Sequence, residues 1–386
     1  MPKNITQIVE PITDGKFEDV AKKIIGLTIK KYPNTCINLF NDNFSHKFPN
    51  PQYLGAKFKH LNWLKEFLPK NIKKVADAFA GSQSVSFFFK QLGYEVYTND
   101  FMNYSNHIGK ALIENNEEIL SDNDLELLFS DNKDKSKFFI MEKLFTDIFF
   151  VREDSQLLDS FRSNVELLSQ IKKSLALATM NRTLTKKITM GHFAHNQALV
   201  YSNNSDRIKR NRSLVRPIKD MFLELVNEYN NAVFDNGSNN KSFQYDAIDF
   251  VEKLNNVDLI YFDPPYCNSH ADYQGFYHLL ETFVENWTDK EFVNGIKRYE
   301  PKLYSGFDKK KDIISSFERL FTVSEKIPYW IISYNDRSYP SKDLMIEMIQ
   351  EHKNVIVKQK PYANSVGGKG SVKGSHELLF ICSPKH

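Results

Sequence analysis

The sequence predicts an α/β protein with a doubly wound, mainly parallel sheet and a mainly helical insertion. Two segments support this: an apolar run at residues 259–262 that ends in Asp-Pro-Pro, and a strand, glycine loop and helix expected over residues 74–92. The third observation is spacing. Asp77 and Asp263 lie 186 residues apart, whereas three βα units need roughly 90 residues. The additional residues predict a large insertion between the strands that end at Asp77 and Asp263.

The composition is typical of a soluble globular protein, and the lack of targeting and membrane segments predicts that it stays in the cytoplasm. The chain has 386 residues, of which 41% are hydrophobic and 26% charged, and its net charge of +3 is too small to identify a partner. Cys36, Cys267 and Cys382 have no metal-ligand spacing, so we expect no metal site and a reducing compartment. No apolar run has membrane-spanning length, and the N-terminus lacks a signal-peptide core, so we expect no membrane association.

Four residues directly follow the apolar run: Asp263, Pro264, Pro265 and Tyr266. Two prolines end a strand and hold the backbone rigid, because proline lacks an N–H group and has a fixed φ. The strand therefore brings a carboxylate, free carbonyls and an aromatic ring to the carboxyl edge of the sheet. Open α/β sheets bind their ligands at that edge.

The segment 74–84 has the features of a ligand-binding turn between a strand and a helix. Gly81 allows the backbone to approach a ligand, and the helix that follows offers free N–H groups to a carboxylate. A second strand, over residues 94–100, ends in Asp100. Nucleotide-binding folds use an acid at this position for ribose hydroxyls, and a helix N-cap is the alternative.

These motifs resemble those of the S-adenosylmethionine (AdoMet)-dependent amino-methyltransferases, which methylate adenine N6 or cytosine N4 in DNA. Asp-Pro-Pro-Tyr resembles their catalytic motif, and Asp77-x-Phe79-x-Gly81-Ser82 their AdoMet-binding motif, although Gln83 stands where the family usually has another glycine. The resemblance implies that Asp263, Pro264, Pro265 and Tyr266 are catalytic. It implies a cofactor site made by Tyr53, Lys57, Asp77, Phe79, Gly81, Ser82, Asp100, Asp246 and Asp263.

Residues 106–242 are expected to form the insertion, with helices over 125–129, 138–150, 157–177 and 211–229. Residues 181–219 carry nine Lys and Arg but a single acid, which favours phosphate contact over a solvated face. We therefore predict DNA binding by Lys186, Lys187, Arg207, Lys209, Arg210 and Arg212, by the basic loop residues Lys369 and Lys373, and base reading by candidates that include Asn196 and Gln197.

The motif order is AdoMet motif, insertion, then Asp-Pro-Pro-Tyr, which resembles the α group of N6-adenine DNA methyltransferases from restriction–modification systems. It implies an N-terminal extension at 1–48, a catalytic domain at 49–105 and 243–386, and a target-recognition domain at 106–242. The expected partner is double-stranded DNA. We expect a monomer, and a cognate restriction endonuclease would act without stable contact.

Three alternatives stay open at this stage. The same acceptors suit cytosine N4, although Asp at the motif start favours adenine. An RNA or protein-amide methyltransferase would rarely carry so large an insertion. A DNA-binding relative without catalysis is the third, and Gln83 is its one indication. After the motif, residues 266–277 are expected to form a polar aromatic loop, and the sequence leaves open whether it closes over a flipped base with Gly275 as its hinge or is a static lid.

Overall fold

The structure, a computed structural model, describes residues 44–188, 191–195, 198–266, 272–293, 295–361 and 375–385. The chain divides into two compact units, Met1–Ser45 and His46–His386, and the fold below is that of the second. Residues 1–43, which make up most of the predicted N-terminal extension, lie outside the described residues. No helix in the described part of the chain has the length and apolar character needed to cross a membrane.

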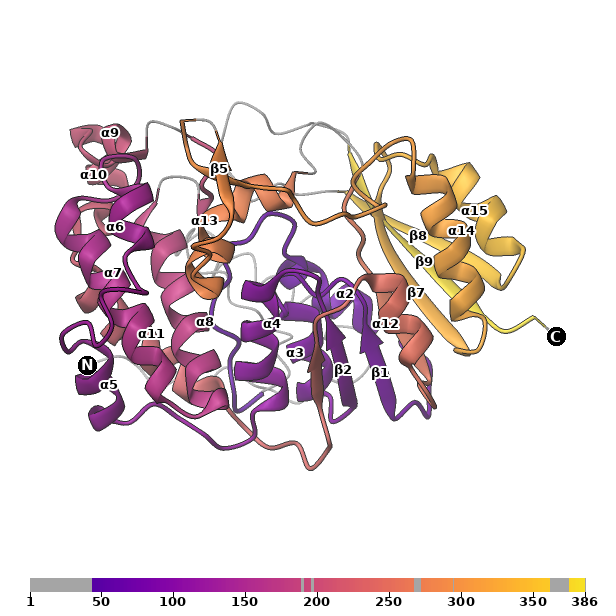
Figure 1. The fold of residues 1–386 in the computed structure, drawn as a ribbon. Coiled ribbons are helices and arrows are strands. Elements are labelled where there is room, and N and C mark those ends of the chain that lie inside the picture. The colour runs from indigo at the N-terminus through magenta and orange to yellow at the C-terminus, as the bar shows by residue number, and fades with distance from the viewer. Residues whose placement is uncertain are drawn as a thin grey trace, which may run out of the picture. The chain divides into compact units, whose positions relative to one another are not determined.

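A seven-stranded sheet forms the centre of this unit, with the order β3-β2-β1-β4-β7-β9-β8 (Figure 1). Strands β3, β2, β1, β4 and β7 pair in parallel, and β9 runs antiparallel to both of its neighbours. The predicted doubly wound α/β sheet is therefore confirmed. The strand bounds are β1 (Lys74–Asp77), β2 (Glu95–Asn99), β3 (Lys241–Phe243), β4 (Leu259–Phe262), β7 (Tyr329–Asn335), β8 (Asn354–Pro361) and β9 (His376–Ser383), with a separate pair, β5 (Glu291–Val293) and β6 (Arg298–Glu300).

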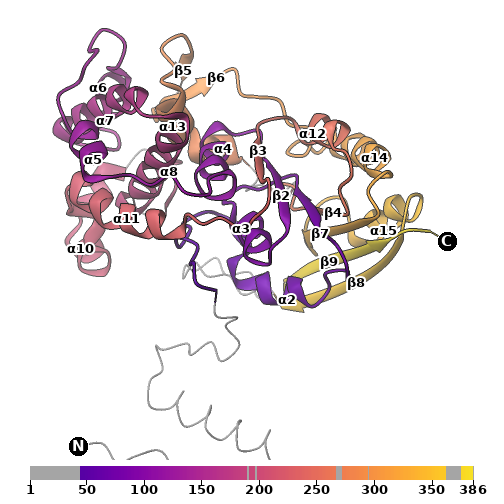
Figure 2. The same cartoon turned by 90° about the horizontal axis from the view of Figure 1, so that it is seen from below.

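Helices cover both faces of the sheet, and the alternation of side chains along β4 explains how (Figure 2). Ile260 and Phe262 point into a core shared with α12 (Ala247–Lys253), α14 (Ile313–Ser324) and α15 (Lys342–Gln350). Tyr261 points the other way and packs edge-on against Phe89 of α3 (Ser84–Gln91). All four residues of β4 are buried, as expected for a central parallel strand.

The segment between β2 and β3 is mainly helical and lies beside the sheet (Figures 1 and 2). Its helices pack through aromatic side chains, for example Phe161 on Phe222 with ring centroids 5.2 Å apart. The remaining helices are α2 (Leu61–Lys65), α4 (Asn103–Gly109), α5 (Asp122–Leu128), α6 (Ile140–Phe145), α7 (Arg152–Asn164), α8 (Gln170–Lys187), α9 (Ala198–Ser202), α10 (Ser205–Arg210), α11 (Ile218–Ala232) and α13 (Tyr273–Glu285). Short helical turns occupy Lys57–His60, Lys110–Glu114, Val165–Leu167 and Arg212–Val215.

Four predicted elements differ in the structure, each for a local reason. The helix expected over 138–150 ends at Phe145, and Asp147 beyond it has a left-handed backbone, φ +64°. The helix expected over 157–177 is two helices, because the Ser169 hydroxyl accepts from the Lys172 N–H and begins α8 afresh. The helix expected over 211–229 begins only after Pro217. Residues 273–277, expected in a loop, form the first turn of α13, where Asp272 accepts from the N–H of Gly275. Gly275 is therefore a helical residue and not part of a loop.

Candidate active site

A pocket of about 970 Å3, including space open to solvent, lies at the carboxyl edge of β1, β2 and β4. Because parallel strands end at one edge, residues far apart in sequence meet there. The pocket is lined by all the residues predicted to contact the cofactor, namely Tyr53, Lys57, Asp77, Phe79, Gly81, Ser82, Asp100, Asp246 and Asp263, and by the other motif residues, Pro264, Pro265 and Tyr266. The structure thus brings together both predicted sets.

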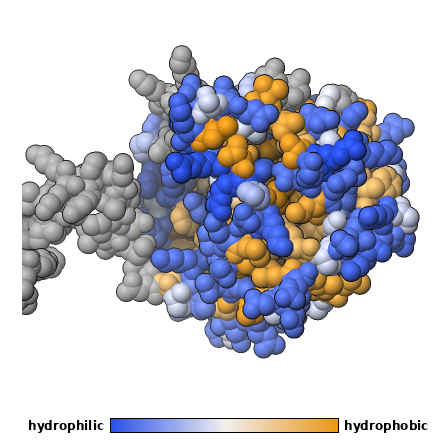
Figure 3. Space-filling model, turned by 90° about the vertical axis from the view of Figure 1, so that its left-hand side faces the viewer, coloured by the Kyte–Doolittle hydropathy of each residue, from blue (hydrophilic) through white to orange (hydrophobic). Residues whose placement is uncertain are grey.

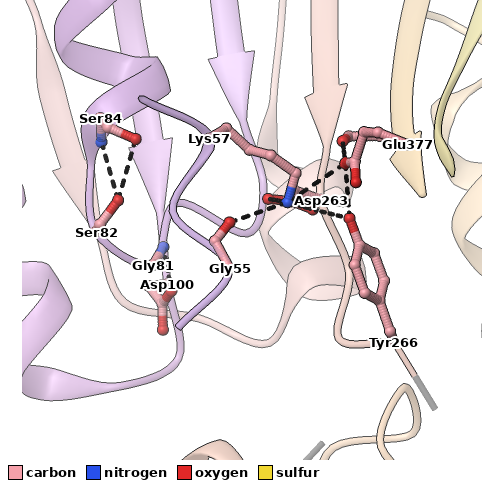
Figure 4. Close-up of polar contacts among 10 residues, drawn as sticks. Gly55, Lys57, Gly81, Ser82, Ser84, Asp100, Asp263, Tyr266 and Glu377 are labelled. Carbon is pink, nitrogen blue, oxygen red and sulfur yellow. Dashed lines mark hydrogen bonds and ion pairs between the residues drawn. The ribbon is translucent and has the colours of Figure 1, made fainter. Parts of the chain in front are cut away.

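Asp263 lies immediately beyond β4 and pairs with a buried lysine (Figure 4). The Lys57 ammonium donates to both carboxylate oxygens of Asp263, at 2.8 and 2.7 Å, and to the carbonyl of Gly55 at 3.0 Å. The Tyr266 hydroxyl lies 3.4 Å from Asp263 Oδ1. The Lys57 ammonium also lies 5.1 Å from the centre of the Tyr266 ring, as in a cation–π contact. The carboxylate of the motif is therefore held from two sides.

Glu377 is a fourth member of this group that the sequence analysis did not single out (Figure 4). It is fully buried, and its Oε1 accepts from Ser333 Oγ at 2.6 Å and from Tyr266 Oη at 2.9 Å. The same oxygen lies 3.6 Å from the Lys57 ammonium. Oε2 is buried and has no hydrogen-bond partner among the described residues.

The antiparallel direction of β9 explains how Glu377 reaches the site. Glu377 lies near the start of β9 and pairs with Asn335, which ends β7. The start of an antiparallel strand lies at the same edge as the ends of its parallel neighbours. When the pairing of a strand is unknown, an acidic residue at its start is most simply predicted to lie on the surface. The signal that could have identified Glu377 is an antiparallel strand placed next to β7.

Burial and the neighbouring charges have opposite effects on the pKa values of Asp263 and Lys57. Burial raises the pKa of Asp263 to about 6, with Glu377 adding to the rise and Lys57 opposing it. Burial alone would lower the pKa of Lys57, but Asp263 and Glu377 more than offset that effect and raise it. Lys57 therefore stays protonated, whereas Asp263 can titrate near neutral pH.

The conformation of the glycine loop between β1 and α3 depends on the positive φ of Gly81 and on backbone hydrogen bonds to Asp100. Gly81 has φ +47°, and a Cβ there would lie 3.0 Å from the Tyr53 ring. Its N–H donates to Asp100 Oδ2, and the N–H of Met102 donates to Asp100 Oδ1, both at 2.8 Å. Burial raises the pKa of Asp100 to about 6. Asp100 therefore holds the loop while its carboxylate still lines the pocket.

Gln83, which stands where the family motif usually has glycine, has a left-handed backbone, φ +66°. This conformation favours glycine, which explains why the family motif has one at this position. In this chain the Gln83 side chain is buried and held in place: Thr98 donates to its Oε1 at 2.6 Å, and its Nε2 lies 3.3 Å from Ser105 Oγ. The loop keeps its left-handed turn without the second glycine.

Asp77 ends β1 beneath this loop and is 1% exposed. Its Oδ2 accepts from Ser86 Oγ at 2.7 Å, whereas its buried Oδ1 accepts no well-formed hydrogen bond from the described residues. Burial raises the pKa of Asp77 to about 7, against the lowering effect of Ser86. A cationic ligand group beside Oδ1 would compensate this buried charge.

Aromatic side chains form the walls of the pocket. The Tyr53 ring stacks on Tyr277 with centroids 5.0 Å apart and planes 4° apart. Phe79 packs edge-on against Phe307 with ring centroids 5.0 Å apart, and both rings line the pocket. Asp246 caps α12 by accepting from the Ile248 N–H, and it lines the same pocket. Flat apolar walls with a few polar groups are typical of small-molecule sites.

The predicted DNA-binding residues of the helical segment differ in exposure. Lys209, Arg210 and Arg212 are exposed, and the Arg207 guanidinium lies 4.0 Å from the Tyr201 ring centre. Lys186 is half-buried, and Lys187 pairs with Asp154 at 3.2 Å and donates to the Arg216 carbonyl, so it is engaged within the protein. The face seen from the side of these helices is largely hydrophilic (Figure 3). Asn196, Gln197, Cys267, Lys369 and Lys373 lie outside the described residues.

Known proteins resemble this chain over most of its length. The model of the D12 class N6 adenine-specific DNA methyltransferase family matches residues 53–348. The type II methyltransferase M2.HphI of Haemophilus parahaemolyticus is 32% identical over 343 residues, which cover 87% of this chain and 98% of that protein. The type II methyltransferase M.CviAII of Paramecium bursaria Chlorella virus 1 is 25% identical over 78% of this chain and 88% of its own length.

A third relative is longer than this chain. Modification methylase LlaI of Lactococcus lactis subsp. lactis is 25% identical over 85% of this chain, but the match covers 53% of that protein. The family match spans most of the chain and contains both the glycine loop and the Asp-Pro-Pro-Tyr motif. The chain therefore belongs to the D12 class N6 adenine-specific DNA methyltransferase family and is an adenine-specific DNA methyltransferase.

Proposed function

We propose that this methyltransferase transfers the methyl group of AdoMet to N6 of an adenine flipped out of duplex DNA. The observation that carries this proposal is the Asp263 carboxylate, which lies at the tip of β4 in a pocket that also contains the glycine loop. An adenine amine inside a duplex cannot reach such a pocket, so the base must leave the stack, at a cost of a few kcal/mol.

Methyltransferases of this family use AdoMet as the methyl donor, and the pocket's residues fit that group. The bare backbone at Gly81 leaves room beside Tyr53, and Asp77 Oδ1 lacks a well-formed hydrogen bond that an ammonium group would supply. We propose that Asp77 faces the ammonium, Asp100 the ribose and Asp246 the adenine amino group, with Tyr53, Lys57, Phe79 and Ser82 completing the site. When bound, the donor supplies an electrophilic methyl group on a positively charged sulfur.

The protein's part in the reaction is mainly positioning. The adenine amine is a weak nucleophile because its lone pair is delocalised into the ring. Asp263 and the Pro264 carbonyl accept its two N–H groups, which directs the lone pair toward the methyl group. A nitrogen–carbon bond forms as the sulfur–carbon bond breaks, and the amine nitrogen then releases one proton toward Asp263 or water. Tyr266 stacks on the flipped ring, and Pro264 and Pro265 keep the acceptors rigid.

The pH dependence of the reaction follows from Asp263. The ionised carboxylate accepts the amine N–H far more strongly than the protonated form does, and burial raises the pKa of Asp263 to about 6. We expect kcat/KM to fall below pH 6 by about tenfold per pH unit. Measuring initial rates from pH 5 to 8 tests this. Asparagine at position 263 has no titratable group in this pH range. If Asp263→Asn shows the same fall in kcat/KM at low pH (the acid limb of the profile), that fall must be assigned to another group.

Substituting Gly81 tests the cofactor loop. A side chain at φ +47° costs about 1–2 kcal/mol, and the added Cβ would press on Tyr53. We expect Gly81→Ala to weaken AdoMet binding by about tenfold or more, as measured by calorimetric titration.

Gly93→Ala is the matched control, because Gly93 also has positive φ but has no heavy atom within 4 Å of the added Cβ. It should lower stability without changing the AdoMet Kd. Equal AdoMet affinity in the Gly81→Ala and wild-type proteins would contradict the assignment of this loop.

We also propose that residues 106–242 form the target-recognition domain of an α-group enzyme. The cations of α10 and the turn after it support this, because these four residues (Arg207, Lys209, Arg210 and Arg212) have one acid among them, Asp206, which pairs with Lys209 at 3.6 Å. Lys369 and Lys373 are proposed to add phosphate contacts. The proposed assembly is a monomer on double-stranded DNA, with a cognate endonuclease that recognises the same site without stable contact.

One experiment tests the proposed function directly. The purified protein is incubated with radiolabelled AdoMet and duplex DNA, and the nucleosides are separated by chromatography. We expect the label in N6-methyladenosine. Label in N4-methylcytidine would replace the proposed substrate by the alternative one. AdoMet binding without transfer to DNA would support a relative that has lost catalysis.

A further inference from the structure

Lys57 occupies the acceptor that the substrate is proposed to use. Its ammonium contacts both oxygens of Asp263, at 2.8 and 2.7 Å, and it is 6% exposed. The ammonium satisfies the carboxylate as an amine donor would, but more strongly, because it carries a charge. Productive binding of the adenine amine therefore requires Lys57 to move its charge away from at least part of Asp263.

Glu377 offers the lysine an alternative position. Its Oε1 lies 3.6 Å from the Lys57 ammonium, and its Oε2 is buried without a hydrogen-bond partner among the described residues. A buried carboxylate oxygen with no partner is costly, so a cation that approached it would be stabilised. Ser333 and Tyr266 fix Oε1, so the lysine, with its flexible stem, is the partner able to move.

We propose that Glu377 is a positioning residue that draws Lys57 off Asp263 when the target adenine and the methyl donor are bound. This inference rests on the proposed function. The bound sulfonium brings a second positive charge into the pocket, and the repulsion between like charges moves Lys57 toward Glu377. Asp263 is then released for the amine. Tyr266 keeps its 2.9 Å bond to Glu377 throughout, which holds its ring beside the docking base.

The test uses Glu377→Gln, which removes the charge but keeps an oxygen acceptor for Ser333 and Tyr266. We expect kcat to fall by about 10- to 100-fold, while the Kd for AdoMet without DNA and the Kd for duplex DNA without a donor stay within about twofold of wild type. Glu377→Asp keeps the charge and should recover part of the loss. A melting curve for each variant separates catalytic loss from unfolding.

Glu281→Gln is the matched control. Glu281 is also fully buried, and its carboxylate accepts from the Tyr104 N–H at 2.7 Å. Burial raises its pKa to about 8, so at neutral pH it is largely protonated and glutamine is a close mimic. This variant should keep wild-type kcat, which shows that substituting a buried glutamate is not in itself harmful.

Two further measurements distinguish positioning from a purely structural role. In a Lys57→Met variant no lysine pairs with Asp263, so Glu377 has no lysine to displace. Adding Glu377→Gln to this variant should therefore cause no further loss of kcat. With a cationic, non-transferring analogue of the methyl donor bound, a duplex with adenine at the target position should bind wild type more tightly than one with purine, which lacks the amine. Glu377→Gln should abolish that preference. The duplex carries the site identified by sequencing methylated host DNA.

The acid limb of the rate profile provides another readout. The titratable groups that face Glu377 are Lys57, His60, Tyr261, Asp263 and Tyr266. Because Glu377 raises the pKa of Asp263, Glu377→Gln should move the acid limb to lower pH. A wild-type kcat and limb in Glu377→Gln, or an equal loss in the Lys57→Met background, would overturn the inference. The proposed function would still stand if wild type methylates adenine and Asp263→Ala does not.

Discussion

Replacing Asp263 with alanine is expected to lower methyl transfer by about 1,000-fold or more, while AdoMet and DNA binding survive. The carboxylate is proposed to orient the amine, an effect realised during the reaction more than in binding. Radiolabel transfer under single-turnover conditions measures the chemical step, and gel shifts on the same preparations measure DNA binding.

The control for this substitution must account for Lys57, which Asp263→Ala leaves paired with Glu377 alone. Asp263→Asn keeps an acceptor oxygen for the amine, so it should retain more activity than alanine. Near-normal turnover in Asp263→Ala would remove Asp263 from the mechanism. Loss of DNA binding together with activity would indicate a structural defect.

The triple substitution of Arg207, Arg210 and Arg212 with alanine is expected to weaken duplex binding strongly. Removing one cation from a DNA phosphate lowers the slope of log K against log salt by about 0.9, so removing three lowers it by up to about 2.7. At low salt, a loss of about 100-fold or more in affinity is expected. Fluorescence anisotropy with a labelled duplex between 50 and 200 mM salt measures both quantities.

A matched control removes three exposed cations from the opposite part of the fold, namely Arg319, Lys326 and Lys342 around α14 and α15. These residues should leave the salt slope nearly unchanged, because they are remote in sequence and structure from the basic helices. If both triple variants show the same slope as wild type, DNA must bind elsewhere on the protein.

Local sequence signals were sufficient to predict much of the fold and the pocket. The apolar run ending in Asp263 predicted β4, because a four-residue apolar segment followed by two prolines has few other conformations. Gly81 and Asp77 predicted the loop after β1, since strand, glycine and helix follow one another directly. Both predictions rest on neighbours in sequence, where local rules apply best.

Of the features that sequence analysis missed, Glu377 and the role of Gln83 depend on contacts with other elements, whereas the break before α8 depends on a local cap. Glu377 enters the site only because β9 pairs with β7 in the antiparallel sense, and no local signal encodes that choice. The break before α8 depended on one capping hydroxyl, Ser169, within an otherwise helical pattern. Gln83 read as a departure from the motif, although Thr98 and Ser105 stabilise its left-handed backbone.

The strand order has a consequence for how the protein matures. The ribosome releases β7 and β8 before β9, yet β9 lies between them in the finished sheet. Until β9 inserts, β7 has an open edge and the Asp263 carboxylate has Lys57 but no Glu377 beside it. Nascent or truncated chains that lack this strand would therefore be unable to complete the reaction centre, which would delay DNA modification until synthesis has passed residue 383.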